Sequence, residues 1–243
     1  MPGPRAGPTV LAMNPITEPI TAAAPAAPGS ATGPWSRAFA AIYGPTLWLG
    51  ELRGMRARRH DLVARASGRT LELGSGTGLN LPHFPDDLDE LILTEPAAPM
   101  RKRLERAVRR SPRTATVLDA PAERIPLPDG SLDTVVSALV LCTVDRPDVV
   151  LHEVRRLLRP GGRLLFLEHV RAESPRLAAW QDRLEGPWRR FAEGCRCNRA
   201  TVELIEAAGF TVERKADETW RAMPAIVRPI VSGSATVATA GGS

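Results

Sequence analysis

The sequence predicts an α/β protein built on a doubly wound, mostly parallel sheet. Between residues 70 and 170, short apolar runs alternate with amphipathic segments of helical period. The apolar run 70–73 leads directly into a glycine-rich loop, as a buried strand does when it feeds a ligand-binding turn. Parallel strands need long crossover connections, and the helical segments between the apolar runs supply them.

Composition indicates an ordinary globular protein of 243 residues, with 43% hydrophobic and 24% charged residues. No apolar run reaches the roughly 18 residues that span a bilayer. The net charge is only +5, and basic residues alternate with acidic ones, so a nucleic-acid partner is not expected. Three cysteines do not form a disulfide framework, which favours a cytoplasmic location.

The chain divides into a tail and one domain. Residues 1–34 are rich in Pro and Ala and are predicted to be disordered, whereas residues 35–238 form the domain. Its first part, residues 35–66, is predicted to be helical with one apolar face. That face packs on the domain, covers the active site as a lid, or contacts a membrane surface. Tyr43, the only tyrosine, is a candidate substrate contact on the lid.

Glycine occupies every second position of the first loop, at Gly74, Gly76 and Gly78. Glycine permits a tight turn, and its missing side chain lets a ligand lie against the backbone. The fingerprint of nicotinamide and flavin sites requires a third glycine five positions after the first, where this chain has Leu79. The loop therefore predicts a nucleoside-binding site of another kind.

Two glutamates accompany this loop. Glu72 lies inside the first predicted strand, where a buried carboxylate needs a cationic partner. Glu95 ends the second strand, 95 − 76 = 19 positions after Gly76, close to the roughly 20 expected of an acid that binds ribose hydroxyls. Its two oxygens can accept hydrogen bonds from both hydroxyls. Residues 53–59, by contrast, are predicted to form a solvated basic face.

The remaining elements follow from hydrophobic periodicity and turn signals. The fourth strand is predicted to be the longest of the buried strands, and the loop after it, residues 142–144, lies where open parallel sheets bind ligands. The predicted strands are 70–73, 91–94, 114–118, 132–141, 163–170, 210–214 and 225–237, and the predicted helices after the glycine loop are 97–110, 147–158, 178–193 and 199–208.

Three segments together resemble the type 11 methyltransferase family, which belongs to the class I S-adenosylmethionine-dependent methyltransferases. They are ELGSGTG (72–78), AERIPLPDGSLDTVVS (122–137) and EVRRLLRPGGRLLFLEHV (153–170). The resemblance implies a Rossmann-like seven-stranded sheet in the order 3-2-1-4-5-7-6 with an antiparallel last strand. It also implies S-adenosylmethionine as cofactor and a small-molecule methyl acceptor.

The resemblance also assigns cofactor-binding roles. The acid Asp119 is expected to accept a hydrogen bond from the adenine amino group. Met100, by its place on the predicted helix 97–110, either lies against the adenine ring or packs in the core. The full predicted cofactor site comprises Glu72, Gly74, Ser75, Gly76, Gly78, Glu95, Met100, Asp119, Ala120 and Leu139.

A narrower resemblance covers more of the chain. LVLCTV (139–144), LEHV (167–170), Trp180, Trp188, Gly194-Cys195 and VRPIVSGSA (227–235) are similar to the methyltransferase-like seven group of membrane-associated thiol S-methyltransferases. That group carries an apolar anchor where this chain has its polar Pro/Ala-rich start. Thiol S-methylation is thus the first expectation.

Alternative functions stay open at this point: C-methylation of a quinone precursor, N-methylation of a phospholipid, or non-catalytic binding of S-adenosylmethionine. His169, at the end of a central strand, is the candidate catalytic base, and a hydrogen-bonded structural histidine is the alternative. Cys142 is expected to line the acceptor pocket. The pair Cys195-x-Cys197 is too small a ligand set to predict a metal site.

Overall fold

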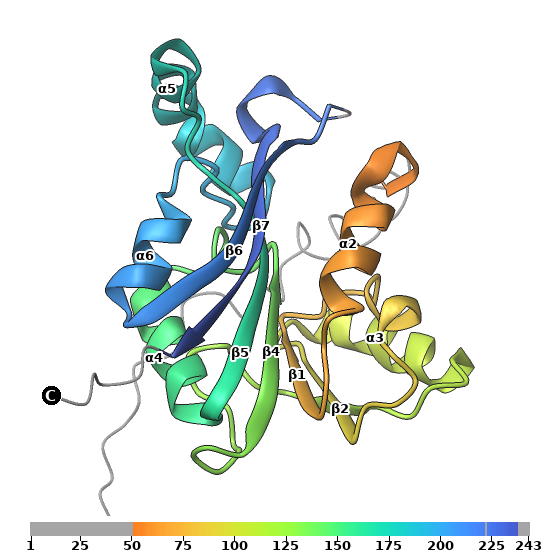
Figure 1. Ribbon diagram of the computed structural model, residues 1–243. Coiled ribbons are helices and arrows are strands. Elements are labelled where there is room, and N and C mark those ends of the chain that lie inside the picture. Colours follow the sequence, from red (N-terminus) through yellow and green to blue (C-terminus); the bar gives the residue numbers. More distant parts are fainter. Residues whose placement is uncertain (1–50, 222, 238–243) are drawn as a thin grey trace, which may run out of the picture.

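A seven-stranded sheet forms the centre of the computed structural model, which describes residues 51–221 and 223–237 (Figure 1). The strand order is β3-β2-β1-β4-β5-β7-β6, and β7 runs antiparallel to both neighbours, so the predicted topology is confirmed. The strands are β1 (Arg69–Leu73), β2 (Glu90–Thr94), β3 (Thr116–Leu118), β4 (Leu132–Ala138), β5 (Leu158–His169), β6 (Phe210–Thr219) and β7 (Pro229–Val237).

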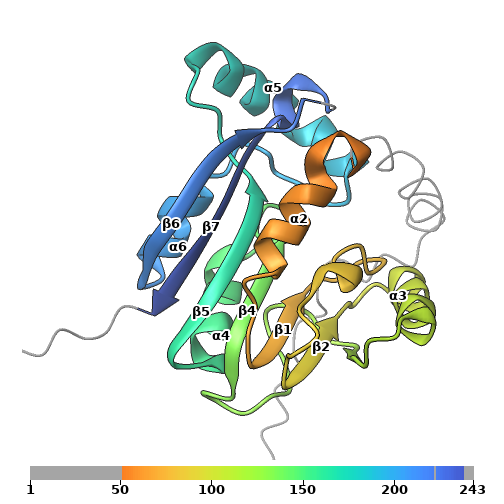
Figure 2. The same cartoon turned by 45° about the vertical axis from the view of Figure 1, so that its right-hand side comes forward.

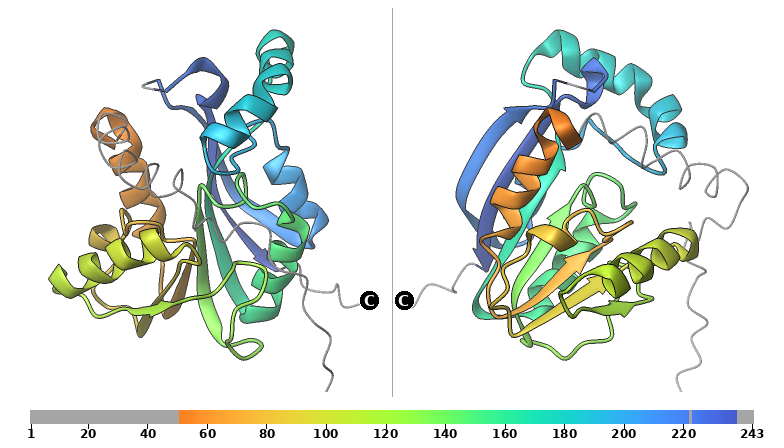
Figure 3. Two further views of the ribbon diagram at one scale, coloured as in Figure 1. Left: turned by 180° about the vertical axis from the view of Figure 1, so that it is seen from behind. Right: turned by 90° about the vertical axis from the view of Figure 1, so that its right-hand side faces the viewer.

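Helices cover both faces of the sheet (Figures 2 and 3). On one face lie α2 and α3, on the other α4 and α6, while α5 stands beyond the end of the sheet where β5 terminates. The helices are α2 (Arg56–Val63), α3 (Ala98–Arg110), α4 (Pro147–Leu157), α5 (Pro175–Phe191) and α6 (Thr201–Ala207), with single turns at η1 (Glu51–Met55), η2 (Leu81–His83) and η3 (Ala225–Val227).

The sheet separates two hydrophobic layers, and β5 contributes side chains to both. Leu164 and Phe166 pack in the layer beneath α4 and α6. Leu165 and Leu167 pack in the layer beneath α2 and α3. Alternate side chains of a strand point to opposite faces, so a strand covered on both sides must be a continuous apolar run.

Several predicted boundaries are wrong. The fourth strand ends at Ala138 and not at 141, because Leu139 turns into the left-handed region with φ 63°. The longest strand is β5, which starts at Leu158 and not at 163, so it includes Pro160, Gly161 and Gly162. Residues 225–227 form a turn before β7, and β6 continues to Thr219.

The predicted tail and most of the predicted lid, Tyr43 included, lie outside the described residues. The lid segment's last part is described: α2 is helical as predicted, whereas η1 is kinked at Arg53 and Gly54, whose backbone angles are not helical. None of the helices in residues 51–221 and 223–237 combines the length and apolar character that a membrane span requires.

Candidate functional site

The glycine loop after β1 has the backbone of a ligand cradle. Gly74, Gly76 and Gly78 all have positive φ, at 50°, 58° and 86°. A Cβ added at Gly74 would lie 3.0 Å from the side chain of Val140, and one added at Gly78 would lie 3.0 Å from that of Leu104. Glycine at these two positions therefore leaves room for neighbouring side chains to pack against the loop. A Cβ at Gly76 would meet only the Gly74 carbonyl oxygen, at 4.0 Å. Gly76 therefore faces open space that a ligand can occupy.

Glu95 joins the end of β2 to this loop. Its carboxylate is 7% exposed and accepts hydrogen bonds from the backbone N–H of Gly76 (2.9 Å) and of Ala97 (2.8 Å). Burial raises its pKa, and these two bonds partly offset the effect. Each carboxylate oxygen keeps a further lone pair, so the geometry is compatible with the predicted ribose contact.

Glu72 is buried in the middle of the site. One carboxylate oxygen, Oε1, accepts a hydrogen bond from the side-chain amide of Asn80, whereas Oε2 has no partner among the described residues. Burial raises the pKa of this carboxyl. A buried acceptor without a donor is costly, so Oε2 is suited to a donor that a ligand brings.

Arg59 supplies the protein's own positive charge at Glu72, and sequence reasoning missed it. The prediction of a solvated basic face over residues 53–59 is wrong for Arg59, which is 4% exposed. Its Nε donates to Glu51 Oε1 (3.0 Å) and its Nη1 to Asn80 Oδ1 (3.1 Å). The sequence does indicate its burial, because Arg59 lies between Met55 and Leu62 at helical spacing. Both of these apolar residues are buried, so Arg59 shares their face of the helix.

These side chains enclose a small hollow beside the glycine loop. Its volume is about 30 Å³, enough for one or two water-sized groups but not for a nucleoside. It is lined by Arg59, Glu72, Gly74, Ser75, Gly76, Thr77, Leu79, Asn80 and Ala138.

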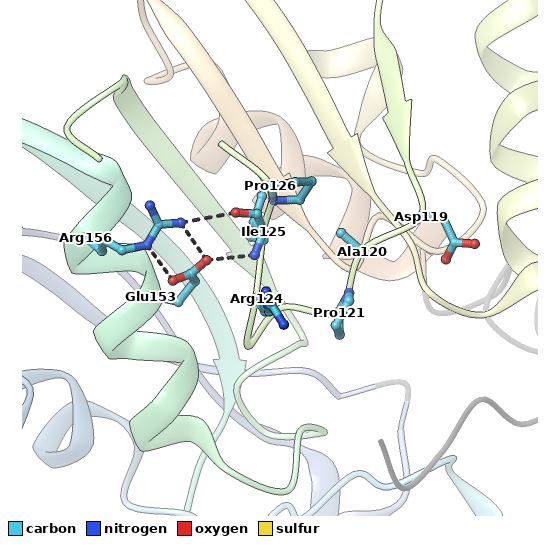
Figure 4. A pocket seen from close by; sticks show the side chains of 8 residues that line it. All are labelled: Asp119, Ala120, Pro121, Arg124, Ile125, Pro126, Glu153 and Arg156. Atoms are coloured by element: carbon cyan, nitrogen blue, oxygen red, sulfur yellow. Dashed lines mark hydrogen bonds and ion pairs between the residues drawn. The ribbon is translucent and has the colours of Figure 1, made fainter. Parts of the chain in front are cut away.

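Asp119 and Ala120 follow β3 and border a larger, open cavity of about 630 Å³ (Figure 4). Its far wall is the pair Glu153–Arg156 on α4, which also binds the backbone of Ile125. Asp119 is paired with Arg101 of α3, with an Nη2–Oδ2 distance of 2.7 Å.

The structure brings the ends of β2 and β3 together, since the N–H of Glu95 donates to the Leu118 carbonyl (3.1 Å). Glu95 and Asp119 therefore lie at one edge of the sheet. Met100 is half-buried on α3. The proposed adenine contacts of Met100 and Asp119 stay predictions.

The loop after β4 is held by one buried carboxylate. Glu168 of β5 is fully buried and accepts hydrogen bonds from the Ser137 hydroxyl (2.7 Å) and from the backbone N–H of Val140, Leu141 and Cys142 (3.1 Å each). This network holds the chain just after Leu139, whose positive φ is rare for a residue with a branched side chain. Sequence reasoning gave Glu168 no role, although an acid inside an apolar strand is the same signal that singled out Glu72.

Cys142 lies on that loop and is buried, together with Cys195, Cys197, Ile226 and Val227. A hydrogen bond with the Cys195 thiol, together with burial, raises the pKa of Cys142 well above its usual range. Cys142 is therefore protonated at neutral pH and not suited to act as a nucleophile, and its predicted place in the acceptor pocket stays a prediction. In the part of the chain that the structure describes, no group of three or more His, Cys, Asp or Glu side chains is arranged to hold a metal ion.

His169 points to the opposite side of β5 from Glu168. It is 5% exposed and stacks on Trp220, with ring centroids 6.0 Å apart. Its Nδ1 has no hydrogen-bond partner among the described residues. Burial lowers its pKa to about 4, although hydrogen bonds to the backbone of Pro229 and Val227 oppose the shift. His169 is thus neutral and weakly basic at pH 7, and its catalytic role stays a prediction.

His169 should make folding sensitive to acid. Its pKa is depressed from 6.5 to about 4 in the folded state, so its contribution is present above pH 6.5 and is lost as the pH falls through 4. Between pH 7 and pH 4.5 the wild type should lose about 2 kcal/mol of stability through this residue. Urea unfolding of His169→Asn at both pH values should show a correspondingly smaller drop. The exposed-residue variant His60→Asn should match the wild type, and an unchanged drop in His169→Asn would refute the assignment.

The residues fit S-adenosylmethionine, the cofactor that the sequence resemblance implies. Gly76 leaves room for a ligand at the backbone, Glu72 offers an unused acceptor, and Glu95 retains lone pairs at the edge where ribose is expected.

Known proteins of similar sequence are methyltransferases. The sequence model of a family described as "Methyltransferase domain" matches residues 71–166. The human protein named thiol S-methyltransferase TMT1B is 37% identical over 171 residues, which cover 65% of this chain and 70% of the relative. Human thiol S-methyltransferase TMT1A is 34% identical over 173 residues, covering 68% and 69%.

Solved structures share the fold at low identity. A putative methyltransferase from Bacillus halodurans has a TM-score of 0.62 and 15% identity, covering 75% of this chain and 98% of its own. Geranyl diphosphate C-methyltransferase from Streptomyces coelicolor, solved with S-adenosyl-L-homocysteine, has a TM-score of 0.59 and 14% identity, with coverages of 75% and 78%.

Proposed function

Because the chain belongs to the class I S-adenosylmethionine-dependent methyltransferases and acts on a small molecule, we propose that its acceptor is a thiol and that the product is a thioether. The observation that carries the proposal is the similarity to two human proteins named thiol S-methyltransferases, each matched over more than two thirds of its length.

The chemistry of the site supports a thiol over acceptors that need a strong base. His169 has a pKa of about 4, and Glu168 is occupied by four hydrogen bonds. An ordinary thiol has a pKa of about 8.5, so a few per cent is already thiolate at neutral pH. An alcohol or a ring carbon would have to be deprotonated or activated by the enzyme.

Bound S-adenosylmethionine supplies a methyl group on a positively charged sulfur. In the transfer, the acceptor thiol would lose its proton to solvent, its sulfur would form the new bond to the methyl carbon, and the bond from that carbon to the donor sulfur would break to leave S-adenosylhomocysteine. The chain's own contribution is alignment and exclusion of water, which can supply several kcal/mol. Glu168 fixes the loop after β4, and the apolar cluster around Cys142 keeps water from that loop.

Acceptor specificity tests the proposal. We expect formation of S-adenosylhomocysteine with an alkyl thiol to exceed that with the alcohol and the amine of the same chain length by at least a hundredfold. The rate should rise with pH toward the pKa of the acceptor thiol, because the thiolate is the nucleophile. Equal rates with the amine, or turnover only with a quinone precursor or a phospholipid, would replace the thiol by that acceptor.

A further inference from the structure

The hollow between α2 and the glycine loop has the charge pattern of a zwitterion site. Arg59 enters from α2 and Glu72 from β1, and both side chains are more than nine-tenths buried. Asn80 lies between them, and its amide oxygen accepts from Arg59 while its amide nitrogen donates to Glu72. One positive and one negative group are thus held in fixed positions at a space of about 30 Å³.

Both charged groups have binding capacity left. Arg59 uses Nε for Glu51 and Nη1 for Asn80, and among the described residues Nη2 takes part in no hydrogen bond. Glu72 Oε2 is a buried acceptor without a donor. A guanidinium that needs an acceptor and a carboxylate that needs a donor complement an α-amino acid, which offers a carboxylate and an ammonium group.

S-adenosylmethionine carries such a group at its methionyl end, and the hollow is too small for its adenosine. We propose that Arg59 binds the carboxylate of that methionyl end, beside the carboxylate of Glu72. The inference concerns the methyl donor, so it rests on the family and not on the proposed thiol acceptor.

Ligand binding separates this role from a purely structural one. In the wild type, calorimetric titration should show that S-adenosylhomocysteine binds at least twentyfold more tightly than its decarboxylated analogue. In Arg59→Met, the affinity for S-adenosylhomocysteine should fall at least twentyfold. The affinity for the decarboxylated analogue should change less than threefold, because that ligand has no carboxylate for Arg59 to bind.

Arg56→Met is the matched control, since Arg56 lies on the same helix and is exposed. It should bind both ligands as the wild type does. Equal affinities of the two ligands in the wild type would overturn the proposal, and this arm needs no variant to fold. A parallel loss of both affinities in Arg59→Met would also overturn it, because Arg59 would then only shape the loop. Neither arm uses a methyl acceptor, so failure of the thiol proposal leaves the result unaffected.

Discussion

Replacing Glu168 with alanine is expected to lower the free energy of unfolding by about 4 kcal/mol and to abolish methyl transfer. The variant leaves the Ser137 hydroxyl and three consecutive backbone N–H groups without their acceptor. Each buried donor that loses its partner costs about 1–3 kcal/mol, less where water enters the space left behind. The loop after β4 then loses the contacts that hold it.

Urea unfolding and a methyl-transfer assay at a temperature where the variant is folded would measure the two effects separately. Glu168→Gln keeps the size of the side chain but replaces one acceptor oxygen by an amide NH₂, which cannot accept hydrogen bonds. We therefore expect an intermediate loss of about 2 kcal/mol in the free energy of unfolding. Glu173→Ala, at an exposed glutamate five positions later, should stay within about 0.5 kcal/mol of the wild type. A loss below 1 kcal/mol in Glu168→Ala would show that the network does not hold the loop.

Substituting Gly76 with alanine should weaken binding of S-adenosylhomocysteine at least thirtyfold while leaving the protein folded. The new Cβ would enter the open space at the cradle, where no protein atom lies closer than 4.0 Å. The positive φ of 58° adds a backbone cost of about 1–2 kcal/mol.

Gly161→Ala separates strain from ligand exclusion. Gly161 has φ of 80° and open space around its Cβ position, but it lies at the start of β5, away from the glycine loop. Both variants should therefore lose similar stability in thermal unfolding, and only Gly76→Ala should lose affinity in calorimetry. Similar affinity losses in the two variants would contradict the placement of the cofactor at Gly76.

The sheet could be predicted from the sequence because buried parallel strands appear as continuous apolar runs. Arg69–Leu73 and Glu90–Thr94 were found in the correct places, and each begins one residue before its predicted start. The end of β4 was missed because Leu139 reverses the chain through contacts with β5, which lies far away in the sequence. Local propensity carries no information on such a partner.

The proximity of the glycine loop to Glu95 could be predicted, because both follow the carboxyl ends of neighbouring parallel strands, β1 and β2. Their contacts with the cofactor stay predictions. Arg59 and Glu168 could not be placed in the same way, since their roles arise from neighbours on other elements. Arg59 of α2 donates to Asn80 in the loop after β1, and Glu168 of β5 accepts from the loop after β4. A charge inside an apolar pattern marks both positions, but its partner becomes visible only in the folded chain.

We propose that this chain moves a methyl group from S-adenosylmethionine to sulfur. The most direct measurement uses donor with a deuterated methyl group, an alkyl thiol as acceptor, and mass-spectrometric fragmentation of the product. We expect the deuterated methyl on sulfur, at a rate far above the enzyme-free reaction and reduced in Gly76→Ala. A label on nitrogen or carbon of a competing acceptor, or bound cofactor without any labelled thioether, would contradict thiol S-methylation.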